Sequence, residues 1–186
     1  MRFAAFTAFV ALAVPAAQPQ PFDLLLRGGL VVDGTGAPGR VADVGIRDGR
    51  IASVGSLAGS RAKETIDVAG LVVAPGFIDV HTHADDIAKR PDAANFTRMG
   101  VTTIVAGNCG GSAVDVAAAF DEIRAARPAV NFATLIGHNS VRAAVMGSAR
   151  RAPSLPELAR MKALVFRAMA DGAVGFSTGL QYVPGT

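Results

Sequence analysis

Short apolar runs alternate with segments of helical spacing from residue 77 onward, and this alternation limits the possible folds more than any other feature of the sequence. The β-branched run at 101–106 is typical of a strand that is buried on both faces, and residues 130–136 form a further strand. Helical spacing over 114–127 separates them, and Pro128 ends that segment. Strand and helix recur about every thirty residues, which predicts parallel strands joined by crossover helices.

Two more strands are expected in this region, which we predict to be an α/β domain over residues 75–186. One lies at 77–80, and another lies at 173–177, after a helix that begins at Ser154. Glu157, three residues after Ser154, completes the pattern of a capping box. A closed (β/α)8 barrel needs eight strands and about 250 residues. The sequence therefore predicts the first half of such a barrel, truncated at the end of the chain and belonging to a longer protein.

Residues 18–74 follow a different pattern, in which short β-type runs are separated by turn residues. Three dipeptides stand between successive runs in the way that hairpin turns do: Gly28-Gly29, Asp48-Gly49 and Ala69-Gly70. About six short strands in about fifty residues are typical of a small all-β unit. We therefore predict a small β-sandwich domain that precedes the half barrel.

Residues 1–17 contain the three parts of an export signal. Met1-Arg2 gives a positive start, residues 3–14 are almost entirely apolar, and Pro15-Ala16-Ala17 supplies small residues for cleavage. The apolar stretch is shorter than the about 18 residues that a membrane span needs. We expect a removable signal, a secreted or periplasmic protein, and no membrane attachment after cleavage. The alternatives are a buried first strand or helix, or an uncleaved anchor.

The amino-acid composition indicates a globular protein and argues against nucleic-acid binding and against stabilisation by disulfides. Hydrophobic residues make up 51% of the chain, which is typical of a globular protein with a core. The formal charge is +3, the basic residues are scattered, and the chain has one Tyr and no Trp. Nucleic-acid binding is not expected without a basic stripe and stacking aromatics. A single cysteine excludes an intramolecular disulfide framework.

Two histidines at the end of the strand at 77–80 form the most informative local pattern, Asp79-Val80-His81-Thr82-His83. Residues two apart on a strand point to the same face, so the imidazoles of His81 and His83 can reach one metal ion. Zinc accepts neutral imidazole ligands readily. Asp79 shares that face and can orient a ligand or support the site from behind it. A chance pair of exposed loop histidines is the alternative.

Cys109 and His138 follow the next two strands, and their roles stay open at this level. Cys109 lies between glycines just after the run at 101–106, and catalytic groups of parallel barrels gather at the carboxyl ends of strands. Its thiolate can be a zinc ligand, a buried structural thiol, or a nucleophile paired with His138. His138 itself belongs either to the rim of an active site or to a loop in which hydrogen bonds satisfy its ring.

Together these motifs resemble the amidohydrolase superfamily and, within it, the N-acyl-D-amino-acid deacylases, or D-aminoacylases. The likeness covers about residues 22–186. It is carried by the strand motif after Ala-Pro-Gly-Phe and by three further stretches: Gly-Asn-Cys-Gly at 107–110, Ile-Gly-His-Asn at 136–139, and Gly-Phe-Ser-Thr-Gly-Leu-Gln-Tyr-Val-Pro-Gly at 175–185. The cysteine motif is the specific part of the resemblance.

The resemblance implies a function and a set of ligands. His81 and His83 would hold one metal position, and Cys109 would bind zinc and bridge to a second site, which implies one or two zinc ions. Tyr182 matches a tyrosine that the family places near the scissile carbonyl. Two later histidines and an aspartate that acts as general base are expected beyond Thr186. The implied substrate is a small N-acyl amino acid, from which a D-amino acid is released.

Two other functions are retained as alternatives. One is a cyclic amidase that acts on hydantoin- or dihydropyrimidine-like rings, which would share the two histidines but not the Gly-Asn-Cys-Gly loop. The other is a non-catalytic, exported metal-binding protein. Because part of the implied ligand set is missing, residues 18–186 alone are expected to bind metal weakly and to show no turnover.

Overall fold

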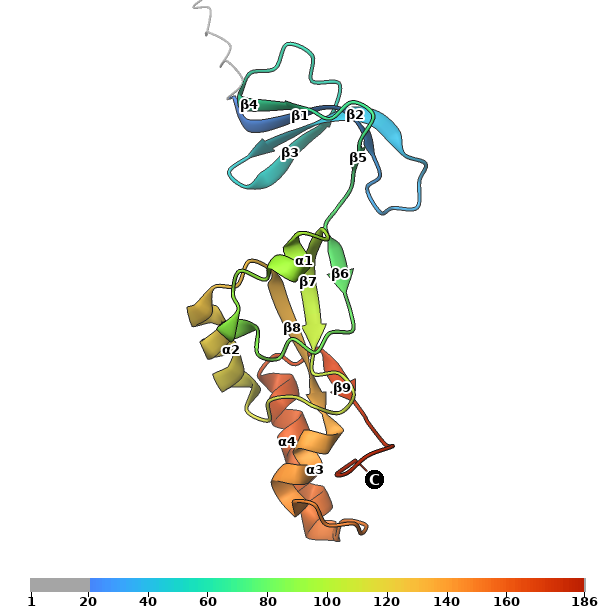
Figure 1. Cartoon of the computed structure of the whole chain (residues 1–186), viewed down its shortest axis with the longest axis vertical. Coiled ribbons are helices and arrows are strands. Elements are labelled where there is room, and N and C mark those ends of the chain that lie inside the picture. Colours follow the sequence, from blue (N-terminus) through green and yellow to red (C-terminus); the bar gives the residue numbers. More distant parts are fainter. Residues whose placement is uncertain (1–20, 186) are drawn as a thin grey trace, which may run out of the picture. The chain divides into compact units, whose positions relative to one another are not determined.

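The computed structural model describes residues 21–185 of the chain. The export signal predicted at 1–17 lies outside the described residues and stays a prediction. The chain divides into two compact units between Pro75 and Gly76, and Figure 1 shows the elements of each. Within residues 21–185, no helix combines the length and the hydropathy that crossing a membrane requires.

The first unit is a single sheet of five strands among the described residues, with the order β3-β2-β1-β4 and β5 beside β1. β1 is antiparallel to β2 and parallel to both β4 and β5. Val31, Ala42 and Val44 form its small buried cluster. The strands are β1 (Phe22–Val31), β2 (Arg40–Arg47), β3 (Arg50–Gly55), β4 (Ala62–Asp67) and β5 (Val72–Val73). A strand-rich unit is therefore confirmed, whereas the second sheet of a sandwich is not.

One of the three predicted hairpins is confirmed. Asp48 and Gly49 join β2 to β3, and Arg47 pairs with Arg50 across the turn. Both turn residues have positive φ, 52° and 70°, as the tight turn of a two-residue hairpin requires.

The other two hairpin predictions were wrong. Gly28 and Gly29 lie inside the ten-residue strand β1, where the register with β2 shifts between Leu26 and Gly29. Gly28 has φ +74° and donates its N–H to Asp43 Oδ1 at 2.9 Å, so the pair forms a bulge instead of a reversal. Ala69 and Gly70 connect β4 to β5, and these two strands run in the same direction along β1.

The second unit is a parallel sheet with the order β6-β7-β8-β9, which confirms the predicted alternation of strand and helix. Two apolar clusters, one around Ile104 and one around Ile136, pack the sheet against its helices. The strands run in one direction, with the helices beside them (Figure 1). The strands are β6 (Phe77–Asp79), β7 (Val101–Ala106), β8 (Asn131–Gly137) and β9 (Gly175–Ser177).

Helices α2 and α4 lie where helical spacing and the capping residues predicted them. The 3-10 helix η1 and helices α1 to α4 cover Ile87–Lys89, Ala94–Thr97, Val116–Ala126, His138–Met146 and Leu155–Ala170. Helix α3 was missed: the Gly-His-Asn-Ser stretch that begins it has the composition of a loop. Val141 nevertheless packs from α3 into the cluster around Ile136, and this tertiary contact outweighs the weak local preference.

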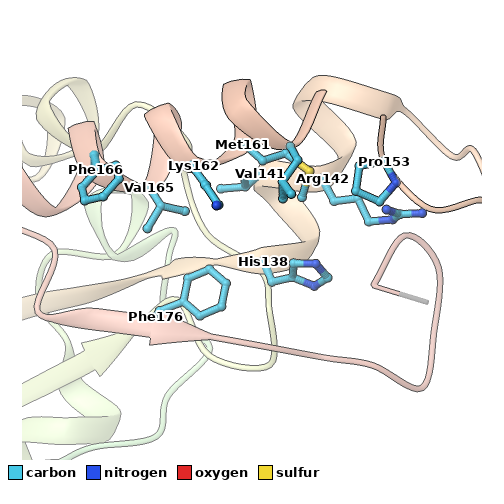
Figure 2. Close-up of a pocket in the computed structure, with 10 residues that line it drawn as sticks. His138, Val141, Arg142, Pro153, Met161, Lys162, Val165, Phe166 and Phe176 are labelled. Carbon is cyan, nitrogen blue, oxygen red and sulfur yellow. The ribbon is translucent and has the colours of Figure 1, made fainter. Parts of the chain in front are cut away.

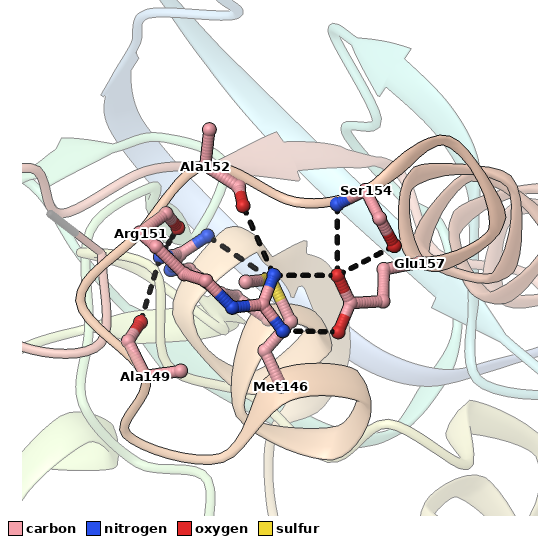
Figure 3. A network of polar contacts seen from close by, with 7 residues as sticks. Met146, Ala149, Arg151, Ala152, Ser154 and Glu157 are labelled. Atoms are coloured by element: carbon pink, nitrogen blue, oxygen red, sulfur yellow. Dashed lines mark hydrogen bonds and ion pairs between the residues drawn. The ribbon is translucent and has the colours of Figure 1, made fainter.

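The start of α4 is fixed by the predicted capping residues (Figure 3). The Glu157 carboxylate accepts hydrogen bonds from the N–H and from the hydroxyl of Ser154, each at 2.8 Å. Arg151 binds the same carboxylate through two nitrogens, both at 2.7 Å. The loop before α4 and the first turn of the helix are thereby joined through one side chain.

Acid will weaken this helix start. Hydrogen bonds from Arg151 and then from Ser154 hold the pKa of Glu157 far below its ordinary value of 4.5. Because the pKa is lowered in the folded state, its stabilising effect is complete above the unfolded pKa and is lost as the pH falls below it. We expect the melting temperature of the wild type to fall more steeply below about pH 4.5 than that of Glu157→Gln. Thermal circular dichroism measures both slopes, and equal slopes would contradict the prediction.

Candidate metal centre

The chain just after β6 is tied to the end of β7 through Thr82. The N–H and the hydroxyl of Thr82 both donate to the carbonyl oxygen of Val105, each at 3.0 Å. Thr82 is buried, whereas His81 and His83 on either side of it are exposed. β6 ends at Asp79, so the histidines follow the strand instead of lying in it. The alternation of a strand nevertheless persists and turns both imidazoles to the face opposite Thr82.

Asn108 closes the same junction from the β7 side. Its amide Nδ2 donates to the carbonyl oxygens of Thr82, at 3.2 Å, and Val105, at 2.9 Å. Asn108 is buried, and its amide joins the segment that carries the histidines to the loop that carries Cys109. Neither Asn108 nor Thr82 was predicted to matter, because no local pattern shows a hydrogen bond between residues 26 positions apart.

Cys109 lies directly across from the histidines. Its backbone adopts a left-handed conformation with φ +54°, which is uncommon for a residue other than glycine. Cys109 Sγ lies 3.5 Å from His81 Nε2, and the rings of His81 and His83 have centroids 5.7 Å apart. One ligand atom from each of the three residues lies within 4.8 Å of the others. The structure thus brings together all three predicted ligand residues.

This donor set suits a zinc ion. Two imidazole nitrogens and one thiolate sulfur are ligands that zinc prefers, at about 2.0 and 2.3 Å. Around a tetrahedral ion, ligand atoms at these distances lie about 3.3–3.5 Å apart. The 3.5 Å between Cys109 Sγ and His81 Nε2 already matches that spacing, and the other pairs, within 4.8 Å, reach it by side-chain rotation. Three protein ligands leave a position open, as catalytic zinc sites do.

The predicted supporting residue Asp79 acts on the main chain. Its Oδ1 accepts the backbone N–H of His81 at 3.1 Å, which fixes the turn that leads out of β6. No hydrogen bond to an imidazole of the cluster is found for Asp79 among the described residues. Asp79 therefore positions the segment that carries His81, while the ring of His81 stays free to turn toward a ligand.

Asp85 is a part of the site that the sequence did not single out. Its Oδ1 accepts the N–H of Gly107 at 3.0 Å, which links the segment after His83 to the loop before Cys109. Desolvation raises the pKa of the Asp85 carboxyl above its ordinary value, and the Gly107 hydrogen bond and the nearby His83 oppose that rise. Its position two residues after His83 is the only local signal that could have identified it.

The end of β9 holds the cysteine loop from the other side. Ser177 Oγ donates to the carbonyl oxygen of Gly107 at 2.5 Å and accepts the N–H of Gly110 at 3.0 Å. One hydroxyl thus bridges the two residues that flank Asn108 and Cys109. The hydroxyl of Tyr182 donates to the carbonyl oxygen of Cys109, so the predicted catalytic tyrosine lies next to the candidate ligand.

His138 does not join the cluster. It is the first residue of α3, and its ring stands 6.2 Å from that of Phe176 on β9. Figure 2 shows both rings along a largely apolar pocket of about 600 Å³, facing Val141 and Met161 on the helices. The pairing of His138 with a nucleophilic Cys109 gains no support from this placement.

Comparison with known proteins identifies close relatives. Residues 64–183 match the amidohydrolase family. The D-aminoacylase of Alcaligenes xylosoxydans xylosoxydans is 45% identical over 89% of this chain and 39% of its own length. The crystal structure of N-acyl-D-glutamate deacylase from Bordetella bronchiseptica, complexed with zinc and a phosphonate mimic of the tetrahedral intermediate, superposes with a TM-score of 0.84. The two sequences are 42% identical, and the match covers 89% of this chain and 40% of the deacylase chain.

Further structures extend the comparison. A D-aminoacylase structure used to study a binuclear metal centre gives a TM-score of 0.83 at 46% identity, over 89% of this chain and 40% of that one. L-Hydantoinase from Arthrobacter aurescens gives 0.52 at 24% identity, over 83% of this chain and 32% of that one, and shares the fold alone. The chain spans about two fifths of the length of the deacylases that it matches.

Proposed function

Since this chain belongs to the amidohydrolase family, we propose that it forms the metal-binding part of a zinc-dependent hydrolase that releases D-amino acids from N-acyl-D-amino acids. The observation that carries the proposal is the convergence of His81, His83 and Cys109 on one point. The 45% identity to a D-aminoacylase supports the substrate class.

His81, His83 and Cys109 would hold one or two zinc ions. The donor set fits, because it combines thiolate with imidazole and has an open side. When bound, zinc polarises a carbonyl oxygen and makes water acidic enough to act as a nucleophile near neutral pH. Relatives support the choice of metal: one deacylase was crystallised with zinc, and a D-aminoacylase was studied for its binuclear centre.

The residues around the centre have separable tasks. Asp79 fixes the main chain at His81, and Asn108 fixes the spacing between the two ligand segments. Tyr182 is proposed to donate its hydroxyl hydrogen bond to the scissile carbonyl of a bound substrate. The hydroxyl would then leave the carbonyl oxygen of Cys109, its present acceptor, so that the substrate replaces a contact next to the ligand.

We further propose that β6 to β9 are the first four strands of a (β/α)8 barrel. Their parallel order and the helices between them support this arrangement. The additional ligands and the general base expected by resemblance would then come from other strands of that barrel. The cyclic amidase is the weaker alternative, because the D-hydantoinase of Ralstonia pickettii is 39% identical over only 48% of this chain, whereas the D-aminoacylase matches over 89%.

A chimera tests the proposed function. Residues 22–186 would replace the part of the Alcaligenes D-aminoacylase to which they align. We expect zinc-dependent hydrolysis of N-acetyl-D-amino acids, little hydrolysis of the L-enantiomers, and no ring opening of hydantoins. Replacing His81 and His83 by alanine in the chimera is expected to abolish the activity. A folded chimera that binds zinc but hydrolyses neither enantiomer would contradict the proposal and favour a non-catalytic metal-binding protein.

The isolated chain provides the matching negative control. We expect residues 18–186 to release no D-amino acid under the conditions in which the chimera is active. Measurable, metal-dependent release by the isolated chain would show that the ligands present are sufficient for turnover.

A further inference from the structure

A second pocket, of about 580 Å³, lies between the start of α3, the loop before α4 and the segment after β9. Four basic side chains line it: His138, Arg142, Arg150 and Arg151. None of its lining residues is acidic. The wall formed by the segment after β9 carries Tyr182, whose hydroxyl binds the carbonyl oxygen of Cys109. The pocket is therefore strongly basic and adjoins the candidate metal centre through one side chain.

Arg142 is a buried cation without a carboxylate partner among residues 21–185. It is 6% exposed, and its guanidinium donates to the carbonyl oxygens of Ala149, at 2.9 Å, and Arg151, at 2.7 Å. Its Nε is buried and has no hydrogen-bond partner in the described part of the chain. Burying an unpaired charge is costly, and carbonyl dipoles offset only part of that cost. The missing component is a negative charge.

The neighbouring basic residues differ in how much charge they leave uncompensated. Arg151 is already neutralised, because Glu157 binds it through both carboxylate oxygens (Figure 3). Arg150 is exposed, and no ion pair is found for it within the described residues. His138 Nδ1 is buried and likewise lacks a partner there. Two positive charges and one unsatisfied ring nitrogen therefore remain at the pocket.

We propose that this pocket binds a carboxylate group, with Arg142 and Arg150 as its cationic partners and His138 as a further hydrogen-bonding contact. Guanidinium groups match carboxylates in charge and in geometry. The carboxylate belongs either to an N-acyl amino acid, whose amide then lies toward Tyr182, or to a free carboxylic acid such as a reaction product. The carboxylate site itself does not depend on the proposed function; only the identification of the carboxylate as that of the substrate rests on it.

The single tyrosine of the chain gives a direct measurement. The chain contains one Tyr and no Trp, so its intrinsic fluorescence reports on Tyr182, in the wall of the pocket. Acetate, N-acetyl-D-alanine and N-acetyl-D-alaninamide would be titrated into the full chain, both zinc-free and zinc-loaded, with calorimetry in parallel. We expect N-acetyl-D-alanine to bind at least about tenfold more tightly than its amide, the size of effect expected for one charge-assisted hydrogen bond.

Three variants locate the binding. Arg150→Gln removes an exposed cation of the pocket and is expected to weaken carboxylate binding about tenfold. Arg160→Gln removes an exposed arginine of α4 that does not line the pocket, and it is the matched control with unchanged binding. Arg142→Met is expected to abolish binding; if that variant does not fold, Arg150→Gln decides the question.

The outcomes separate this inference from the proposed function. Equal affinity for the acid and the amide, or carboxylate binding that survives Arg150→Gln unchanged, would overturn the carboxylate site. Tighter binding of N-acetyl-D-alanine than of acetate identifies the substrate as the source, and equal binding identifies free carboxylates. Carboxylate binding by the zinc-free chain supports the pocket even if His81, His83 and Cys109 bind no zinc. The absence of zinc binding would refute the proposed function and leave the carboxylate site standing.

Discussion

Replacing Cys109 by serine is expected to lower the affinity of the chain for zinc by at least about 100-fold. A serine hydroxyl stays protonated near neutral pH and cannot replace the thiolate that zinc prefers. Loss of a residue that merely supports a ligand costs about 10- to 100-fold, so loss of the ligand itself should cost more. Competition with a chromophoric chelator measures the affinity, and the loss of thiolate-to-metal absorption after cobalt substitution confirms the cause.

The third histidine of the chain supplies the matched control. His138 lies outside the cluster of His81, His83 and Cys109, so His138→Gln is expected to leave zinc affinity within about twofold of the wild type, an effect within the usual scatter for a residue without contact to the ion. His81→Gln should reduce it as Cys109→Ser does. Zinc binding that survives Cys109→Ser, or is lost in His138→Gln, would show that the ion is held elsewhere.

Replacing Asn108 by leucine is expected to lower the free energy of unfolding by about 2–4 kcal/mol. The change keeps most of the volume but leaves the carbonyl oxygen of Thr82 without its amide partner at a buried junction. The same change removes one of the links between the segment that carries His81 and His83 and the loop that carries Cys109, while the hydrogen bond between Asp85 and Gly107 remains. Zinc affinity should therefore fall by about 10- to 100-fold, although Asn108 touches no metal.

Asn131 provides the comparison for that variant. Its amide donates from β8 to the neighbouring strand β7, to the carbonyl oxygen of Thr102 at 3.1 Å, but Asn131 is exposed. Asn131→Leu is expected to cost under about 1 kcal/mol and to leave zinc binding unchanged. Urea unfolding followed by circular dichroism measures both variants. Equal losses of stability would mean that the Asn108 amide is no more than an ordinary surface hydrogen bond.

The parallel unit was predictable because its signals are local and repeated. The β-branched run at 101–106 corresponds to β7 residue for residue, since β-branched side chains favour strands. Burial on both faces is only partly observed, because Thr102 is exposed. The capping residues Ser154 and Glu157 marked the start of α4 for the same reason, because their contacts span three positions. The alternation of side chains around Thr82 placed both imidazoles on one face.

The first unit was harder to predict from local pattern. A glycine pair between apolar runs fits both a reversal and a bulge, and the choice at Gly28 depends on Asp43, fifteen positions away. The direction of β4 and β5 is set by their pairing with β1, which no turn signal at Ala69-Gly70 contains. Predicting hairpins at both places therefore treated long-range pairing as if it were local.

The candidate site divides along the same line. His81, His83 and Cys109 could be named because metal ligands have a recognisable chemistry and because strand ends meet at one edge of a parallel sheet. Asn108 and Asp85 could not, since an amide and a carboxylate that bind main-chain groups look like ordinary loop residues in a sequence.

If the proposed centre binds zinc, the hydroxyl of Ser177 couples β9 to that binding. No side chain of β9 belongs to the cluster of His81, His83 and Cys109, yet this hydroxyl forms hydrogen bonds with the cysteine loop at Gly107 and at Gly110. Binding equilibria that share a structural element are linked, and each must favour the other. An ion that binds the correctly placed sulfur therefore also stabilises the packing of β9 against the cysteine loop. Any change that loosens β9 should in turn lower the affinity for the metal.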